Sequence, residues 1–367
     1  MKKLVKHFIF LGLIAPIFMA CDQNDPDPFP SEQIKGCYVF NYGLYDSGGS
    51  SITKYNSETE ELTNYYYRAQ NNQLELLSNI QHAGIYNDSI YLIGNAPDQL
   101  ITLDPLFRQT RDGISEKLAN PRYFVGHENY LYISCYGENP DWADMPSSYI
   151  AKFSIENQNV EKIISLPGGP EGMAVAHGKL FVAMNFIDSI AVISLDNDHA
   201  VSYIATPSVT SYFVKDAQEN LWVTLVSTHS DPSMETGLGY INTTQHTLET
   251  VFPLNGVSSG WSSVLSANSD GSRLYLLASD WVEEPAGTWV QKGAAYTFDP
   301  VSGTFALFAG NLTGANGIVS NPANNDVYIL TGASVTEAGS VRIYTEEGQF
   351  IHEFICGVSP YWAFFLE

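Results

Sequence analysis

The chain has 367 residues, 44% of them hydrophobic and 13% aromatic, with 40 acidic residues against 17 lysines and arginines. This length is enough for one large domain or two smaller ones with buried cores. The formal net charge of −23 argues against nucleic acid and anionic membrane surfaces as partners, because both would repel the protein.

The first 20 residues are typical of a secretion signal and not of a folded element. Three lysines precede an apolar run over residues 8–19, which is short for a membrane span. The run ends in Phe18-Met19-Ala20-Cys21, which resembles a bacterial lipobox. We therefore expect cleavage before Cys21 and lipid on its sulfur, which would anchor the chain without spanning the bilayer. An ordinary secretory signal with a chance cysteine is the alternative.

Residues 21–35 predict a flexible tether, because they are acidic, rich in proline and without apolar periodicity. The acidic residues directly after Cys21 also resemble the surface-export signal of Bacteroidetes lipoproteins. The expected location is the outer membrane, with the protein lipid-anchored and exposed at the cell surface. The folded domain would then span residues 36–367.

A repeat organises that domain. An aromatic residue recurs within a short apolar run at intervals of 41 to 53 residues, at Tyr38, Tyr91, Tyr132, Phe181, Trp222, Tyr275 and Tyr328. Alternating hydrophobicity inside each unit and turn residues between units indicate four short strands per unit. In one unit, for example, we expect strands over 172–176, 179–184, 189–195 and 200–205. The fold class predicted is all-β, a seven-bladed β-propeller.

The two ends of the repeat predict how the ring closes. The run 37–42 has no innermost strand before it, and the run 360–366 is left over after the last complete unit. Pairing the C-terminal strand with the N-terminal blade would close the ring and cover the open sheet edges. Two stacked β-sandwiches are the competing architecture, but they explain neither the recurrence nor the leftover strand.

Three cysteines remain after Cys21, namely Cys37, Cys135 and Cys356. The repeat places them in different blades, or at opposite ends of the closing strands, so we expect buried free thiols. There is no Cys-x-x-Cys and no Cys/His ligand spacing, and we predict no metal site.

The repeat also predicts where a ligand would bind. Propellers use the face that carries the ends of the second strands and the loops leading into the innermost strands. Four residues beyond the repeat aromatics lie Tyr42, Asn95, Tyr136 and Asn185, and nearby loops add further aromatic and polar residues. The candidate ligand-binding residues are Tyr42, Asn95, Arg122, Tyr123, Tyr136, Trp142, Asn185, Phe186, Tyr212, Trp261, Trp281, Asn316 and Trp362.

Tryptophan and tyrosine dominate this set, and we expect them to face solvent. Aromatic rings with hydrogen-bonding tips suit a large, partly apolar ligand rich in amides. The alternative for each single ring is that it packs under a loop and covers the core.

Signatures of a nucleophile with its base, and of a phosphate-binding loop, are absent from the sequence, and we predict no enzyme activity and no catalytic residue. Propeller lactonases hold an axial metal with oxygen ligands, and Asn95, Glu171, Asn185 and Asp231 could do the same. Their more frequent role is as turn residues. His82 and His229 stand alone and are expected to be structural.

The residues resemble a known family. The opening Tyr38-Val39-Phe40-Asn41-Tyr42-Gly43, the following Gly/Ser loop and Ile52-Thr53-Lys54-Tyr55-Asn56 are similar to the start of YncE-like (DUF5074) surface propeller lipoproteins of Bacteroidetes. The turn Ser269-Asp270-Gly271 with the following Ser272-Arg273-Leu274-Tyr275 is shared more widely by YVTN-type propellers. The resemblance covers essentially the whole chain after Cys21.

That family includes BtuG-type lipoproteins, which capture cobalamin at the cell surface and pass it to a TonB-dependent outer-membrane transporter. The resemblance implies cobalamin (vitamin B12) or a related corrinoid as ligand, and no cofactor beyond it. The alternatives are capture of a siderophore, haem or glycan by the same architecture, a metal-dependent propeller lactonase or hydrolase, and a purely structural surface protein.

Overall fold

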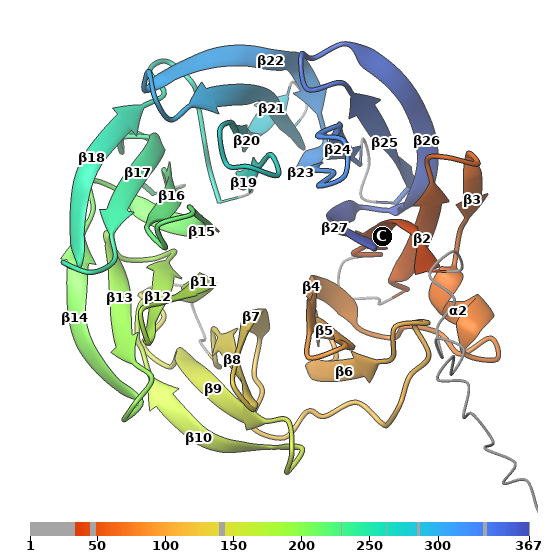
Figure 1. Ribbon diagram of the computed structural model, residues 1–367, viewed down its shortest axis with the longest axis horizontal. Helices are drawn as coiled ribbons and strands as arrows, with labels where there is room; N and C mark the ends of the chain where they lie inside the picture. Colours follow the sequence, from red (N-terminus) through yellow and green to blue (C-terminus); the bar gives the residue numbers. More distant parts are fainter. Residues whose placement is uncertain are drawn as a thin grey trace, which may run out of the picture.

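Seven antiparallel sheets stand around a central axis as the blades of a β-propeller (Figure 1). The computed structural model describes residues 34–44, 49–138, 144–228, 230–261, 263–284, 287–332 and 336–366. The predicted fold class is confirmed, and the two-sandwich alternative is excluded. Cys21, with the predicted signal and most of the tether, lies outside the described residues. Within those residues, no helix is long and apolar enough to cross a membrane.

The chain builds blades 2 to 7 one after another, each from its innermost strand outward, whereas the innermost strand of blade 1 is the last strand of the chain. Blade 1 contains β27 (Pro360–Leu366), β1 (Gly36–Asn41), β2 (Ser51–Asn56) and β3 (Glu61–Thr63); blade 2 contains β4 (Asn79–Tyr86), β5 (Ser89–Asn95) and β6 (Gln99–Leu103); blade 3 contains β7 (Pro121–His127), β8 (Tyr130–Cys135), β9 (Tyr149–Ser154) and β10 (Asn159–Ser165); blade 4 contains β11 (Pro170–Ala176), β12 (Lys179–Met184), β13 (Ser189–Ser194) and β14 (His199–Ala205).

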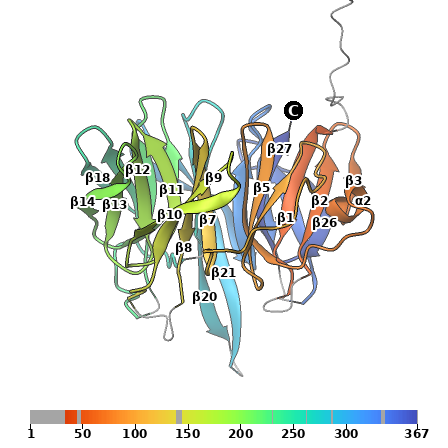
Figure 2. The ribbon, with the colours of Figure 1, turned by 90° about the horizontal axis from the view of Figure 1, so that it is seen from below.

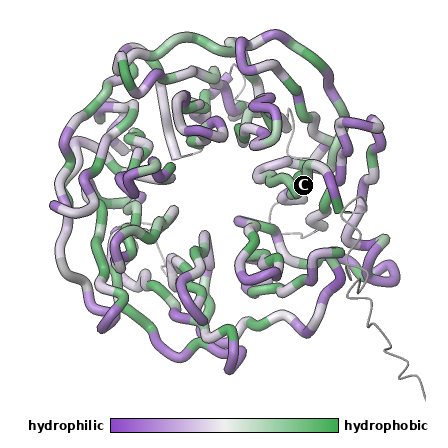
Figure 3. Tube along the Cα trace, in the orientation of Figure 1, coloured by the Kyte–Doolittle hydropathy of each residue, from purple (hydrophilic) through white to green (hydrophobic). Residues whose placement is uncertain are grey.

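The remaining three blades have four strands each. Blade 5 contains β15 (Val209–Lys215), β16 (Leu221–Val226), β17 (Gly237–Asn242) and β18 (Thr247–Pro253); blade 6 contains β19 (Val264–Ala267), β20 (Leu274–Glu284), β21 (Thr288–Asp299) and β22 (Thr304–Thr313); blade 7 contains β23 (Ala315–Ser320), β24 (Val327–Thr331), β25 (Ala338–Tyr344) and β26 (Phe350–Val358). Hydrophilic and hydrophobic residues alternate along many of these strands (Figure 3).

Blade 2 departs from the predicted four strands, because it has only three. Its outer edge receives two isolated bridges, Leu103 to Gln109 and Leu100 to Ile114. Pro105 cannot donate to a ladder, and the polar run 108–113 has no apolar alternation to bury. A short helix that the sequence did not predict, α2 (Tyr66–Gln70), lies between blades 1 and 2 and buries Tyr66 and Tyr67.

The repeat aromatics form the cores between blades. Each lies on the second strand of its blade and is at most 6% exposed. Tyr38, for example, stacks on Phe107 at a centroid distance of 4.2 Å. Their spacing is therefore a packing requirement, since every blade needs one large ring at the same level to fill the wedge against its neighbour.

The ring closes as predicted. β27 pairs with β1 in antiparallel register from Gly36 opposite Leu366 to Asn41 opposite Pro360. The C-terminal strand is thus the innermost strand of the first blade, and Figure 1 shows it on the axis side of β2. Closure pairs the inner edge of β1 and gives this blade the same innermost strand that the other blades have.

The long hairpin of β20 and β21 extends beyond the other strands on the side away from the C-terminus (Figure 2). Its outer part runs from Asp280 opposite Lys292 to Glu284 opposite Thr288. The sequence predicted a shorter second strand here, over 273–278. The additional residues make this hairpin a wall on one side of the ring.

All three described cysteines are buried free thiols, as predicted. Burial raises the pKa of Cys135 and of Cys356 to about 12. Burial, and then the neighbouring Cys356, raise the pKa of Cys37 as well. Thiolate is the reactive form, so the folded state protects all three.

Thiol reactivity gives a direct test of this fold. A chain beginning at residue 22 carries only Cys37, Cys135 and Cys356. We expect Ellman's reagent to modify none of them within minutes at pH 8 in the folded protein, and all three in guanidinium. Rapid reaction of Cys37 or Cys356 without denaturant would show that the closing blade opens, contrary to the packing.

Candidate functional site

Six of the seven innermost strands break register close to their first residues. The shifts fall between Ile80 and His82, Pro121 and Tyr123, Pro170 and Met173, Thr210 and Phe213, and Ala315 and Gly317, and in β27 between Pro360 and Trp362. Only β19 has no such shift within its described residues. A β-bulge inserts an extra residue and re-aims the side chains around it.

The bulges let two consecutive side chains of one strand contact the neighbouring innermost strand. Side chains of a regular strand alternate between its faces. Here the Arg122 Nη1 donates to the Gln81 Oε1 at 2.6 Å, while the next residues, Tyr123 and His82, stack at a centroid distance of 3.8 Å. The axis therefore carries a polar layer and, directly below it, an aromatic layer.

The polar layer, called the polar collar below, consists of Gln81, Arg122, Tyr136, Glu171, Asn185 and Ser211. Its centre is an ion pair in which the Arg122 Nε and Nη2 donate to the two Glu171 oxygens at 3.0 and 3.2 Å. The Tyr136 hydroxyl donates to the Glu171 Oε2 at 2.5 Å.

Asn185 extends the polar collar to the next blade. Its Nδ2 lies 2.9 Å from the Tyr136 oxygen and 3.3 Å from the Glu171 Oε2. The Ser211 Oγ in turn donates to the Asn185 Oδ1 at 2.8 Å. The collar thus joins blades 2 to 5 through side chains alone, and each bond restricts the rotamers of the next residue.

The charges of the polar collar are compensated. Burial by itself would lower the pKa of Arg122, but the Glu171 carboxylate, with Tyr136 and Tyr361, outweighs burial and holds that pKa well above its usual value. The guanidinium also lies 4.8 Å from the Tyr136 ring centroid. Burial and Glu171 raise the pKa of Tyr136, so its hydroxyl stays protonated and continues to donate.

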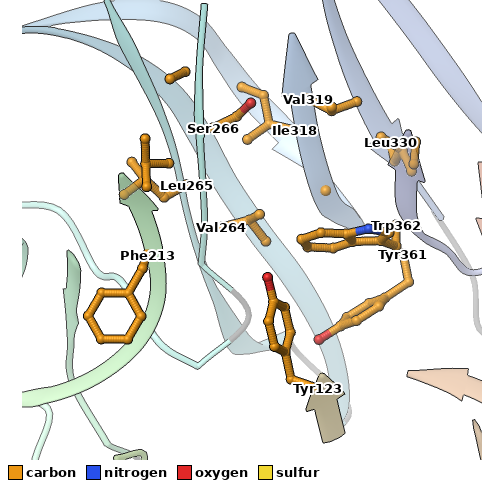
Figure 4. A pocket seen from close by; sticks show the side chains of 14 residues that line it. Tyr123, Phe213, Val264, Leu265, Ser266, Ile318, Val319, Leu330, Tyr361 and Trp362 are labelled. Carbon is orange, nitrogen blue, oxygen red and sulfur yellow. The ribbon is translucent and has the colours of Figure 1, made fainter. Parts of the chain in front are cut away.

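The aromatic layer consists of His82, Tyr123, Tyr212 and Trp362. Trp362 meets His82 edge-on at 4.7 Å and lies 6.2 Å from both Tyr123 and Tyr212, measured between ring centroids. The Tyr212 hydroxyl is 2.9 Å from that of Tyr361. Beside these rings lies a cavity of about 250 Å³, and Figure 4 shows Tyr123 and Trp362 next to each other among its lining side chains.

An aromatic pair, one ring exposed and the other half-buried, lies at the rim above the polar collar. Trp261 is 40% exposed, yet its Nε1 donates to the backbone oxygen of Asn185 at 3.1 Å. Its ring contacts Phe186 at a centroid distance of 5.0 Å, and Phe186 meets Tyr136 edge-on at 5.7 Å. We call Trp261 and Phe186 the rim platform, because the hydrogen bond holds an exposed ring in place.

The long hairpin stands beside the rim platform. Trp281, on β20, is 48% exposed. The loop that carries Trp261 is bound to this hairpin, since the Gly260 nitrogen donates to the Ser279 oxygen at 2.9 Å and the Ser258 hydroxyl donates to Asp280 at 2.5 Å. Rim platform and hairpin are therefore parts of one rigid unit.

The structure brings most of the predicted residues to this region. Arg122, Tyr136 and Asn185 belong to the polar collar; Tyr123, Tyr212 and Trp362 to the aromatic layer; Phe186, Trp261 and Trp281 to the rim. Tyr42 and Asn95 end the second strands of blades 1 and 2, and both are half-buried. Asn316 occupies the bulge of β23. Trp142 lies outside the described residues.

One expectation about these residues was wrong. Tyr136 and Tyr212 were expected to face solvent but are only 5% and 6% exposed, and Tyr123 and Trp362 are half-buried. The innermost strands converge on the axis, so large rings at their start pack on one another across it. Among the candidate residues, the exposed aromatic surface is limited to the rim.

Sequence reasoning missed Gln81 and Ser211 and treated Glu171 only as a potential metal ligand or turn residue. Within the described residues, no group of three or more His, Cys, Asp and Glu side chains converges on a metal position. Glu171 is instead the acceptor of the polar collar. The bulges have no sequence signature here. Strand alternation therefore could not predict the side to which the Gln81 and Glu171 side chains point.

Comparison with known proteins identifies the family of this chain. A family model described as a domain of unknown function, DUF5074, matches residues 35–355. The chain belongs to the DUF5074 family. No curated protein matches the sequence.

Several solved structures share the fold of this DUF5074 protein. A quinonprotein alcohol dehydrogenase-like protein from Bacteroides thetaiotaomicron superposes with a TM-score of 0.64 at 14% identity, covering 91% of this chain and 79% of the other. Hydrazine synthase from Kuenenia stuttgartiensis gives 0.61 at 12% identity, covering 77% and 88%. A functionally unknown protein from Desulfotomaculum acetoxidans gives 0.59 at 14%, covering 88% and 99%. At these identities the likeness concerns the fold alone.

The ion pair of the polar collar predicts a large effect of a small substitution. Glu171→Gln keeps the shape of the side chain but leaves the Arg122 charge uncompensated in a largely buried site. We expect a loss of about 2–3 kcal/mol in the free energy of unfolding, measured by urea denaturation. The matched control is Glu353→Gln, which breaks the exposed pair with Arg342 and should cost less than about 1 kcal/mol. Equal losses in both variants would contradict this account.

His82 predicts a pH dependence of stability. Burial lowers its pKa to about 3, whereas the unfolded chain titrates near 6.5. Between these values only the unfolded state binds the proton, so stability falls as the pH falls from 6.5 towards 3, by up to about 1.4 kcal/mol per pH unit. His82→Phe should remove this part of the slope. Parallel denaturation curves of both proteins from pH 7 to pH 4 measure the difference, and identical slopes would refute it.

Proposed function

We propose that this protein captures cobalamin or a related corrinoid on the face of the propeller that carries the rim platform. The observation that supports the proposal most directly is the Trp261–Phe186 pair, in which a hydrogen bond to Asn185 fixes an exposed indole above the polar collar. A ring that is already immobilised loses little conformational entropy when a ligand covers it. Trp281 on the neighbouring hairpin provides a second exposed indole.

The chemistry of this face suits a large, partly apolar ligand with amide groups. Indole faces cover apolar edges, while amide groups of the ligand pair with the polar atoms that surround the rings. A corrinoid combines these two features, since its macrocycle is fringed by amide side chains.

We propose binding without catalysis. The carboxylate of the polar collar, Glu171, already accepts hydrogen bonds from Arg122, Tyr136 and Asn185. A carboxylate held in this way has little capacity left to accept a further proton, so it is poorly suited as a general base. The polar collar is better suited to a rigid floor beneath the bound ligand.

The start of β1 shows at which face of the propeller the proposed tether would join. β1 begins at Gly36, opposite Leu366, and ends at the level of the mouth. A tether from a lipid on Cys21 would therefore join the propeller at the face opposite the rim platform, and its predicted flexibility would leave the mouth free to approach a membrane protein. We propose that the loaded protein transfers its ligand to a TonB-dependent outer-membrane transporter.

Titration of the purified protein with cyanocobalamin tests the proposal. We expect a saturable heat signal by isothermal titration calorimetry, and we expect Trp261→Ala and Trp281→Ala each to weaken binding at least about tenfold, because exposed, fixed aromatic residues dominate binding energies. The matched control is Tyr203→Ala, which removes a 51% exposed ring from the outer strand β14 and should leave the affinity unchanged. The absence of heat at micromolar protein would refute the corrinoid as ligand, and an equal loss in the control would refute the location.

A further inference from the structure

A recess at the axis lies apart from the rim platform. It has a volume of about 380 Å³ and lies between the innermost strands β27, β4 and β7. Its walls include the rings of His82, Tyr86, Tyr123, Phe124, Trp362 and Phe364. It adjoins the cavity of Figure 4, with which it shares Tyr123, Trp362 and Ala363.

The recess opens away from the mouth. Its lip includes Ile85, which is 45% exposed and lies near the end of β4, whereas the bulge at Gln81 that belongs to the polar collar lies near the start. A ligand in the recess would therefore enter from the face opposite the rim platform. The polar collar and the aromatic layer separate the two places.

Glycines make the aromatic walls possible. A Cβ at Gly84 would meet the Phe124 ring at 2.9 Å, and a Cβ at Gly126 would overlap the Tyr86 ring. The two glycines thus let rings from adjacent blades lie directly against backbone. The resulting surface is flat and aromatic, which favours a planar ring as occupant, since stacked and edge-on contacts both become available.

His82 is the most deeply buried of the polar side chains that line this recess. It is only 5% exposed, and its Nδ1 is buried without a hydrogen-bond partner. Its side chain makes ring contacts with Tyr123, Phe124 and Trp362 and no hydrogen bond to any described residue. Buried polar groups are usually paired, and one without a partner at the wall of a cavity needs an explanation.

A hydroxyl group on a planar ring would satisfy His82. A neutral imidazole has one donor and one acceptor nitrogen. The His82 Nδ1 is inaccessible, so a hydroxyl in the recess would pair with Nε2, which lies toward Gly84 on the recess wall. Burial keeps the imidazole neutral, because its pKa is lowered to about 3. A charged ligand would be disfavoured, since the recess supplies no opposite charge among its lining residues.

We propose that this recess is a second binding site, which takes a small planar aromatic molecule bearing a hydroxyl group, with His82 as the hydrogen-bond partner and Tyr123 and Trp362 as the walls. The proposal is independent of what binds at the rim platform. The site would give the protein a second ligand class on its opposite face.

The test compares 2-naphthol with naphthalene, using the purified full-length protein and naphthalene-ring fluorescence. We expect saturable binding of both probes, with 2-naphthol binding about tenfold more tightly, as one hydrogen bond to a buried group would give. In His82→Phe this preference should disappear while naphthalene still binds. His352→Phe is the matched control, because it removes an imidazole stacked on Tyr55, and it should keep the tenfold preference.

A second measurement covers the case in which His82→Phe does not fold. In the unmodified protein labelled with ¹⁵N on histidine, 2-naphthol should shift the ring nitrogen resonances of one neutral histidine, and naphthalene should shift them much less. Failure of both probes to bind would refute the site. Equal affinity of the two probes for the unmodified protein, or an unchanged preference in His82→Phe, would refute the role of His82. Cyanocobalamin binding, measured separately, reports only on the rim platform.

Discussion

The antiparallel pairing of β27 with β1 is the constraint on which the rest of this structure depends. Residues at the two ends of the described chain form neighbouring strands of one sheet, from Gly36 opposite Leu366 to Asn41 opposite Pro360. Without that pairing, blade 1 would lack its innermost strand and present an open edge to the axis. The rings of Tyr38, Phe40 and Phe364, which pack together across this pairing, would lose their partners. Closure therefore contributes both hydrogen bonds and hydrophobic burial at a single place.

Closure fixes the innermost strands around one axis, and the bulges then decide what those strands present there. In a regular strand Gln81 and His82 would face opposite sides, yet both contact β7, one through Arg122 and the other through Tyr123. The extra residue of each bulge separates a polar layer from an aromatic layer without changing the fold. The register shift thereby places the fixed, compensated charges of the polar collar at the axis.

The two layers divide the propeller into two different faces. On one side, the polar collar supports Trp261 through the Asn185 backbone oxygen. On the other, Trp362 and His82 end the aromatic layer above a mostly apolar recess, in whose described lining His82 carries a buried nitrogen without a hydrogen-bond partner. The one-residue bulges give the two faces of the propeller different chemistry. One axis can therefore offer two different binding sites.

The sequence by itself determined the architecture. Seven aromatics at near-regular spacing, Tyr38 among them, and the unpaired run 360–366 sufficed to predict the number of blades and the closing strand, because alternation and repetition are local and survive in one dimension. Counting from those aromatics also located Tyr136 and Asn185 correctly at the strand ends. The prediction of four strands was wrong for blade 2, since Pro105 and the polar run that follows it leave the outer strand unformed.

Only the tertiary structure decided which side chains meet. Arg122 and Glu171 are separated by most of a blade in sequence, and neither strand alternation nor spacing indicates that they form a buried ion pair. The same holds for Tyr212 and Tyr361, which come from blades 5 and 1 and meet across the axis. The physical reason is that contacts at the centre of a propeller depend on closure and on bulge register together. Both arise from pairing between strands and not from the pattern within one of them.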